Sequence, residues 1–316
     1  MDKNIKIIID TDIGDDIDDA FALLLAAELN IDIVGITTVF LNTPQRARIT
    51  KKLLKLYGDG YEDTPVFSGY GSPLKENAKK YPNLCQYTPD IDDDIYAPDS
   101  ENPEDAVDFI IESCKKYKDE LTLIAIGPFT NIARAAMKDS DALNLAGRIV
   151  IMGGAYYKQY ADWNVMCDVE AADIMFRTLK NIRCIGADVT HKLEISKDDD
   201  TTIVNCKNVS PLASYISELY SLWKEERRRY GKRDIGVLHD PLTIYYAYDE
   251  SICKCEKASL VTVTEGAARG LVLNVDSYGK AHMNPFYDTA SIPTKHTVAK
   301  AVNREKILSE FIKCFK

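Results

Sequence analysis

Short apolar runs alternate with amphipathic stretches along the first part of the chain. Apolar runs bounded by polar residues predict buried strands, and apolar positions three or four apart predict helices. The predicted strands are Lys6–Ile9, Ile31–Val39, Leu121–Ile126, Arg148–Met152 and Ile182–Ala187. The predicted helices are Ala20–Leu29, Arg46–Tyr57, Pro103–Tyr117, Phe129–Met137 and Val169–Leu179. This alternation indicates an α/β fold, with a mostly parallel central sheet flanked by helices.

The pattern becomes less regular after Ser196, which predicts a smaller, irregular or helical C-terminal part. It contains a long helical stretch, Pro211–Tyr230, and a candidate strand pair at Val261–Val263 and Leu271–Val275. No repeat or low-complexity linker divides the chain, so we expect a single domain over residues 1–316. The segment Ser68–Glu101 has no clear period, and a loop this long in a compact domain is usually functional or mobile.

The composition argues against several kinds of partner. The formal net charge is -10, so nucleic-acid binding is not expected, because a phosphate backbone needs clustered lysine and arginine. The apolar run Lys6–Ile9 is too short for a signal segment or a membrane span, so no membrane association is expected. Eight scattered cysteines lack the spacing of a zinc site, which favours reduced thiols in the cytoplasm.

An acidic loop follows the first predicted strand. Six of the ten positions from Asp10 to Asp19 are aspartate. Asp16 or Asp18 can cap the following helix, but six crowded carboxylates oppose folding unless a cation or a proton lies among them. Oxygen ligands without histidine or cysteine favour a hard cation, Ca²⁺ or Mg²⁺. Because open α/β sheets bind ligands at the carboxyl ends of their strands, we expect a metal site here.

The loop is one of a series of motifs. The stretch Asp10–Ala26 has a strand ending in Asp-x-Asp-x-Gly, followed by an Asp-Asp-Ala helix start. Later motifs are Ile36–Val39 with Asn42, Pro65-Val66 to Pro73-Leu74, Gly127–Ala133, Met152–Gly154, Asp162–Asn164 with Asp168–Ala172, Asp188–His191 and His239–Pro241. In this order they resemble the inosine–uridine-preferring nucleoside hydrolase family. The resemblance implies a Rossmann-like nucleoside hydrolase fold and calcium-dependent cleavage of ribonucleosides to ribose and free base, in nucleoside catabolism and salvage.

The resemblance also implies a role for individual residues. Asp12, Asp19, Asp240 and the carbonyl of Thr130 would hold Ca²⁺, and Asp12 would accept a proton from the attacking water. His239 would be the acid beside the leaving base, since the ordinary pKa of histidine allows proton donation near neutrality.

The ribose would be bound by a second set of residues: Asp18, Asn42, Met152, Asp162 and Asn164. Asp10 is expected to orient the acidic loop from the end of the strand. Relatives form dimers or tetramers, so a homo-oligomer is expected.

The chain departs from the family pattern at several positions. The first loop is two residues longer than the shorter family form, with Asp15 and Asp16 added. We align Asp18-Asp19-Ala20 with the family's Asp-Asp-Ala. The alternative alignment, on Asp15 and Asp16, stays open. Leu41 replaces a usual glycine, and Asp162 replaces a usual glutamate. The segment Ser68–Glu101 contains no histidine, so the sequence leaves the preferred base open.

The remaining histidines and aromatic residues are expected to pack. This applies to His191, His282, His296 and Trp163, while Tyr156, Tyr157 and Tyr160 either pack or line the base pocket. Two other functions stay open. One is a haloacid-dehalogenase-type phosphatase with Asp10 as nucleophile and Mg²⁺ as metal, although no convincing set of partner residues is found. The other is a non-catalytic relative that binds calcium and a sugar.

Overall fold

The computed structural model describes residues 5–58, 60–75, 84–207, 209–276 and 295–316. Within them, one nine-stranded sheet has the order β3-β2-β1-β4-β5-β6-β9-β7-β8. The strands are β1 (Lys6–Thr11), β2 (Asp32–Thr38), β3 (Val66–Ser68), β4 (Leu121–Ala125), β5 (Arg148–Met152), β6 (Ile182–Ile185), β7 (Cys253–Thr262), β8 (Val272–Asn274) and β9 (Lys295–Val302). The strands from β3 to β9 in this order pair in parallel, and β7 and β8 continue the sheet in antiparallel pairs.

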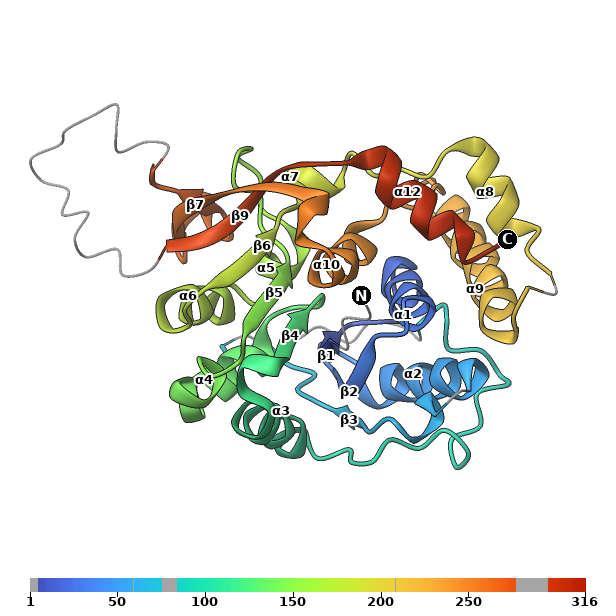
Figure 1. The fold of residues 1–316 in the computed structure, drawn as a ribbon, viewed down its shortest axis with the longest axis horizontal. Coiled ribbons are helices and arrows are strands. Elements are labelled where there is room, and N and C mark those ends of the chain that lie inside the picture. Colours follow the sequence, from blue (N-terminus) through green and yellow to red (C-terminus); the bar gives the residue numbers. More distant parts are fainter. Residues whose placement is uncertain (1–4, 59, 76–83, 208, 277–294) are drawn as a thin grey trace, which may run out of the picture.

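Helices cover both faces of the sheet (Figure 1). They are α1 (Asp18–Glu28), α2 (Thr43–Tyr57), α3 (Pro103–Tyr117), α4 (Thr130–Leu143), α5 (Trp163–Cys167), α6 (Val169–Thr178), α7 (Ala187–Thr190), α8 (Lys197–Val204), α9 (Pro211–Arg229), α10 (His239–Tyr248) and α12 (Arg304–Lys313). Successive residues of a strand point to opposite faces, so each strand contributes to two cores. Ile7 and Ile9 of β1 belong to the core with α1, α2 and α10, whereas Ile8 belongs to the core with α3, α4 and α6.

The order in which successive strands are added to the sheet reverses at β1, near its centre. β1 pairs with β2 on one side and with β4 on the other. The helix after β1 packs on one face, and the helix after β4 packs on the opposite face. The two connections therefore diverge at the carboxyl ends of β1 and β4, which is where open α/β sheets bind their ligands.

The predicted fold class is confirmed, and the differences are local. The predicted strand Ile182–Ala187 ends at Ile185, because α7 begins at Ala187. The predicted helix Phe129–Met137 continues to Leu143 across a break at Asp139, where φ is -158°. The candidate late strand pair is confirmed as β7 and β8. The short β3 and the long β9, which extends the parallel sheet, were not predicted.

Two expectations about the whole chain can be compared with the structure. None of the described helices has the length and apolar character needed to cross a membrane. All eight cysteines lie in the described ranges and are free thiols.

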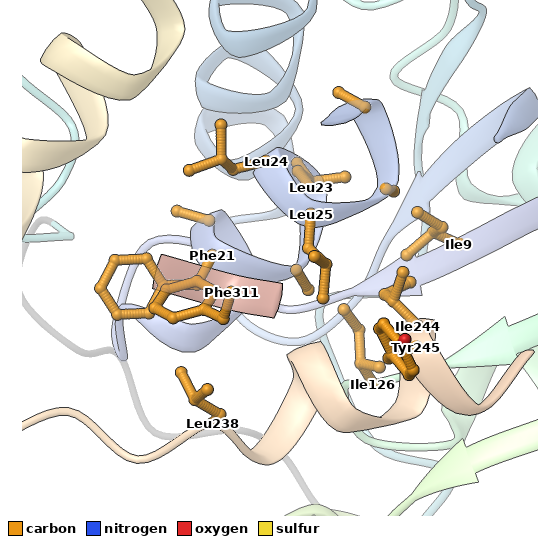
Figure 2. Packing of buried hydrophobic residues seen from close by; sticks show 14 of the residues in the cluster. Ile9, Phe21, Leu23, Leu24, Leu25, Ile126, Leu238, Ile244, Tyr245 and Phe311 are labelled. Atoms are coloured by element: carbon orange, nitrogen blue, oxygen red, sulfur yellow. The ribbon is translucent and has the colours of Figure 1, made fainter. Parts of the chain in front are cut away.

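Phe21 of α1 lies at the centre of the larger core. Its ring is fully buried and lies 5.4 Å from the ring of Tyr220 and 4.9 Å from that of Phe311, measured between centroids. Figure 2 shows Phe21 directly beside Phe311, so this contact joins the first helix of the chain to the last. Because α1 begins in the acidic loop, this contact also supports the position of that loop.

We expect Phe21→Ala to lower the free energy of unfolding by about 3–5 kcal/mol, because it leaves a cavity among rings that cannot collapse together. Urea unfolding followed by circular dichroism measures this. Met137→Ala is the control, because its side chain is 65% exposed, and it should change stability by no more than about 0.5 kcal/mol. Equal losses in the two variants would show that this aromatic contact is not central to the core.

Candidate active site

Three carboxylates from two helices meet beyond the end of β1. Asp18 and Asp19 lie in the first turn of α1, and Asp240 lies in the first turn of α10. One oxygen from each lies within 4.8 Å of the other two, and all three side chains are buried. The backbone N–H of Asp240 also donates to the Asp18 carboxylate over 3.4 Å. The N-terminal ends of both helices point at this cluster, and their dipoles favour negative charge there.

Asp12 adds a fourth buried carboxyl to the electrostatics of this site. Burial raises the pKa of Asp12 well above its usual value, and repulsion from Asp19 raises it further. Burial likewise raises the pKa of Asp240, with added repulsion from Asp18, Asp19 and Asp12. These groups therefore cannot all be ionised together unless a cation compensates them. Oxygen donors without histidine or thiolate fit a hard cation such as Ca²⁺.

The structure brings some of the predicted metal ligands into the carboxylate cluster and leaves others outside it. Asp19 and Asp240 come together with Asp18, which we had assigned to the ribose. Asp12 is buried close enough for repulsion from Asp19 to raise its pKa, and its role as a ligand stays a prediction. Thr130 is buried at the start of α4, and its hydroxyl donates to Asp168 over 2.7 Å. The role of the Thr130 carbonyl stays a prediction.

The connection after β4 touches the acidic loop. A Cβ built on Gly127 would lie 2.9 Å from the backbone nitrogen of Asp12 and 3.0 Å from its Oδ1. Such distances are shorter than a carbon atom tolerates, so this position requires glycine. The two divergent connections are therefore in direct contact at the site.

Asp10 links the end of β1 to β2 and α4, and its expected role in orienting the acidic loop stays a prediction. Its Oδ1 accepts from Thr37 of β2 over 2.6 Å and from the Asn131 side chain over 2.8 Å. Asn131 also donates to the Thr38 carbonyl over 3.0 Å, so one amide of α4 joins both strands. We did not single out Asn131 from the sequence, although a polar amide among the apolar residues of a helix start was a usable signal.

The residues assigned to the ribose lie at the same edge of the sheet. Asn42 directly precedes α2, is half-buried and makes no capping bond with its side chain. Asn164 donates to the carbonyls of Ile126, over 2.7 Å, and Met152, over 3.1 Å. Asp162 caps α5 by accepting from two backbone N–H groups, and burial raises its pKa to about 6. Their contact with a sugar stays a prediction.

His239 lies in a chain of polar and aromatic contacts. Its Nδ1 is 2.6 Å from the Thr190 hydroxyl, and the ring of His191 meets it edge to face at 5.2 Å. Tyr160 stacks on His191 and hydrogen-bonds to its Nδ1 over 3.0 Å. Burial, and then repulsion by His191, lowers the pKa of His239 to about 3. The ordinary pKa assumed from the sequence therefore does not apply, and His239 is a neutral imidazole near pH 7.

Comparison with known proteins identifies the family. The family model described as inosine-uridine preferring nucleoside hydrolase matches residues 7–309. The chain belongs to this nucleoside hydrolase family. Uridine nucleosidase 1 of Arabidopsis thaliana is 32% identical over 283 residues, which cover 86% of this chain and 82% of that protein. The inosine-uridine preferring nucleoside hydrolase of Leishmania major is 28% identical, covering 83% of this chain and 84% of that protein.

Solved structures agree with this family assignment. The plant nucleoside hydrolase PpNRh1 superposes with a TM-score of 0.83 at 29% identity and covers 99% of both chains. The purine-preferring ribonucleoside hydrolase of Gardnerella vaginalis has a TM-score of 0.74 at 26% identity, with 98% of both chains covered.

Within this nucleoside hydrolase chain, the two extra aspartates lie outside the carboxylate cluster. Asp15 and Asp16 are both exposed, and Asp15 pairs with the Arg46 guanidinium over 2.6 Å. This geometry favours the alignment in which Asp18 and Asp19 match the family's Asp-Asp-Ala.

Several expectations for the aromatic residues are also resolved. Trp163 was expected to pack, but it is 57% exposed, and its ring meets that of Phe40 at 88° with 6.4 Å between the centroids. Tyr156 packs, and its hydroxyl donates to the Gly153 carbonyl over 2.6 Å. His296 is buried as expected, and His282 lies outside the described residues. His191 was expected only to pack, but it contacts His239.

We expect Gly127→Ala to lower the free energy of unfolding by about 1–3 kcal/mol, because the new methyl group collides with backbone that cannot turn away. Urea unfolding of the purified variant measures this. The matched control is Gly236→Ala, where the nearest atom is the flexible tip of Ile195, 2.9 Å away. If Gly127→Ala is as stable as this control, the connection after β4 is looser than described.

Proposed function

We propose that this chain hydrolyses the N-glycosidic bond of ribonucleosides with the help of Ca²⁺, giving ribose and free base. One observation carries the proposal: Asp18, Asp19 and Asp240 converge beside Asp12 at the divergence of β1 and β4, in a member of a nucleoside hydrolase family. The match to this family also removes the support for a haloacid-dehalogenase-type phosphatase.

The metal would be held by Asp12, Asp19, Asp240 and the Thr130 carbonyl, with Asp18 beside them. Their buried oxygens fit Ca²⁺, whose coordination number is high and flexible. When bound, the cation would orient water and the ribose hydroxyls, lower the pKa of that water and keep the carboxylates ionised.

The protein's own groups then have distinct tasks. Asp12 would accept a proton from the attacking water, and Asp18 would hydrogen-bond to the ribose. Cleavage of a glycosidic bond gives the sugar oxocarbenium character, so a surrounding set of carboxylates stabilises the transition state. The ribose would be positioned by a further set of residues: Asn42, Met152, Asp162 and Asn164.

His239 would donate a hydrogen bond from its neutral imidazole to the leaving base and so stabilise the negative charge that the base gains as the bond breaks. If the Thr190 hydroxyl donates to Nδ1, the ring carries its proton on Nε2, which is the nitrogen left for the base. Donation from a neutral ring is compatible with the buried position of His239.

Assembly and location belong to the same proposal. We expect a homo-oligomer, a dimer or a tetramer, acting on a small-molecule ribonucleoside without nucleic-acid or membrane partners. The free thiols support a reducing compartment such as the cytoplasm. Light scattering on the eluting protein gives the oligomeric state.

The function is tested by incubating the chain with uridine, cytidine, inosine and adenosine, with and without a chelator, and measuring reducing sugar. Uridine is included because a relative with 32% identity is named a uridine nucleosidase. We expect release of ribose that stops with chelator and returns with Ca²⁺. A protein that binds ribose but releases none from any nucleoside would be a non-catalytic relative, and the proposal would be wrong.

We expect Asp12→Asn to lower kcat on the best nucleoside by about 10²–10⁴-fold, because it removes the base that accepts the proton of water. Steady-state kinetics at saturating Ca²⁺ measure this. Asp63→Asn, an exposed aspartate far along the chain from the acidic loop, is the control and should behave as wild type. An unchanged rate in Asp12→Asn would refute the role of this residue.

We expect His239→Ala to slow uridine hydrolysis by about 10²-fold or more, because the departing base then lacks a proton donor. The rate on 4-nitrophenyl riboside should change much less, since nitrophenolate leaves without protonation. The ratio of the two rates is the measurement. Equal losses on both substrates would show that His239 positions the sugar rather than assisting the base.

A further inference from the structure

Arg46 is a cation buried beneath the acidic loop. It lies on α2, and its side chain is 0% exposed, which is unusual because arginine seldom gives up all contact with water. Its guanidinium finds four acceptors. Nε donates to the Phe40 carbonyl over 2.7 Å, Nη1 donates to the carbonyls of Asp12 and Ile13, and Nη2 pairs with Asp15.

These acceptors come from two different connections. Asp12, Ile13 and Asp15 lie after β1, and Phe40 lies after β2. The rigid fork of a guanidinium can hold several acceptors at fixed angles, which a lysine ammonium cannot do. Arg46 therefore joins the backbone that presents Asp12 to the backbone that leads into Asn42.

The second connection needs such support. Phe40 and Leu41 have φ angles of 70° and 58°, in the left-handed region that residues with bulky side chains avoid. The backbone N–H groups of Phe40 and Leu41 donate to the carbonyls of Tyr70 and Gly71, over 2.9 and 2.7 Å, and these bonds stabilise the turn. The hydrogen bond from Arg46 to the Phe40 carbonyl adds a third bond to this turn.

Asp15 completes the arrangement. A buried guanidinium is costly without an anion, and Asp15 supplies the anion at 2.6 Å. Its carboxylate is thus occupied by Arg46, and it does not join Asp18, Asp19 and Asp240.

We propose that Arg46 is a positioning residue that fixes the Asp12 backbone and the Phe40–Asn42 turn together, with Asp15 as its counter-ion. This inference rests on the proposed function, because it assigns the two connections to metal binding and ribose binding. A purely structural arginine would affect only stability. A positioning residue also affects Ca²⁺ affinity and the KM for the nucleoside in variants that remain folded.

The test uses the full chain, stripped with a chelator and titrated with Ca²⁺ alone in a calorimeter. Supporting residues around metal ligands typically change metal affinity by about 10–100-fold when they are replaced. We expect a loss in this range for Arg46→Met, a smaller loss for Arg46→Lys, and a loss of at least several-fold for Asp15→Asn. The KM for uridine should rise in the same order at saturating Ca²⁺.

The matched control is Arg48→Met, two positions along the same helix. Arg48 forms ion pairs with Asp93 and Glu101 at 3.1 and 2.8 Å and reaches none of the acceptors of Arg46. It should lose some thermal stability and keep the Ca²⁺ affinity and the KM of wild type. If Arg46→Met does not fold, Arg46→Lys and Asp15→Asn decide.

The inference is overturned if folded Arg46 variants bind Ca²⁺ as tightly as wild type and keep its KM. It is also overturned if Arg48→Met changes both quantities equally. A wild-type chain that binds no Ca²⁺ would instead remove the proposed function, and the inference with it. The calorimetric titration of wild type is therefore done first.

Discussion

The mutual repulsion of buried carboxylates is the constraint on which this structure depends. Asp12, Asp18, Asp19 and Asp240 are all buried at one edge of the sheet, where burial and neighbouring charge raise their pKa values. Such a group opposes folding unless cations, dipoles or hydrogen bonds offset it. The surrounding structure supplies part of this compensation, through two helix N-termini and the guanidinium of Arg46. The rest falls to an ion that the oxygens can hold.

Parallel topology makes this concentration of charge possible. Asp240 lies 222 positions after Asp18 in the chain, yet the two are hydrogen-bonded because α10 packs beside α1 (Figure 1). Around them, polar side chains join the ends of neighbouring strands: Asp10 with Asn131, and Asn164 with the carbonyl of Met152. These bonds fix groups that a reaction needs in constant relative positions, which lowers the entropy lost when substrate binds.

The sequence predicted the central strands, the parallel sheet and the position of the acidic loop, because each is encoded by a local pattern. It did not predict β9, whose neighbours β6 and β7 lie far from it in the chain. It did not show that Asp18 and Asp19 lie beside Asp240, because Asp240 is distant in the chain. The role of Asp18 at the ribose stays a prediction. The contact of His191 with His239 and the exposure of Trp163 also depend on tertiary packing, which one-dimensional patterns do not contain.

The most direct measurement is a crystal structure of the chain grown with Ca²⁺, with an anomalous difference map. The account predicts one peak in the cluster, at about 2.3–2.6 Å from carboxylate oxygens of Asp12, Asp19 and Asp240 and from the Thr130 carbonyl. Side chains that turn away from one another, with no peak between them, would contradict it.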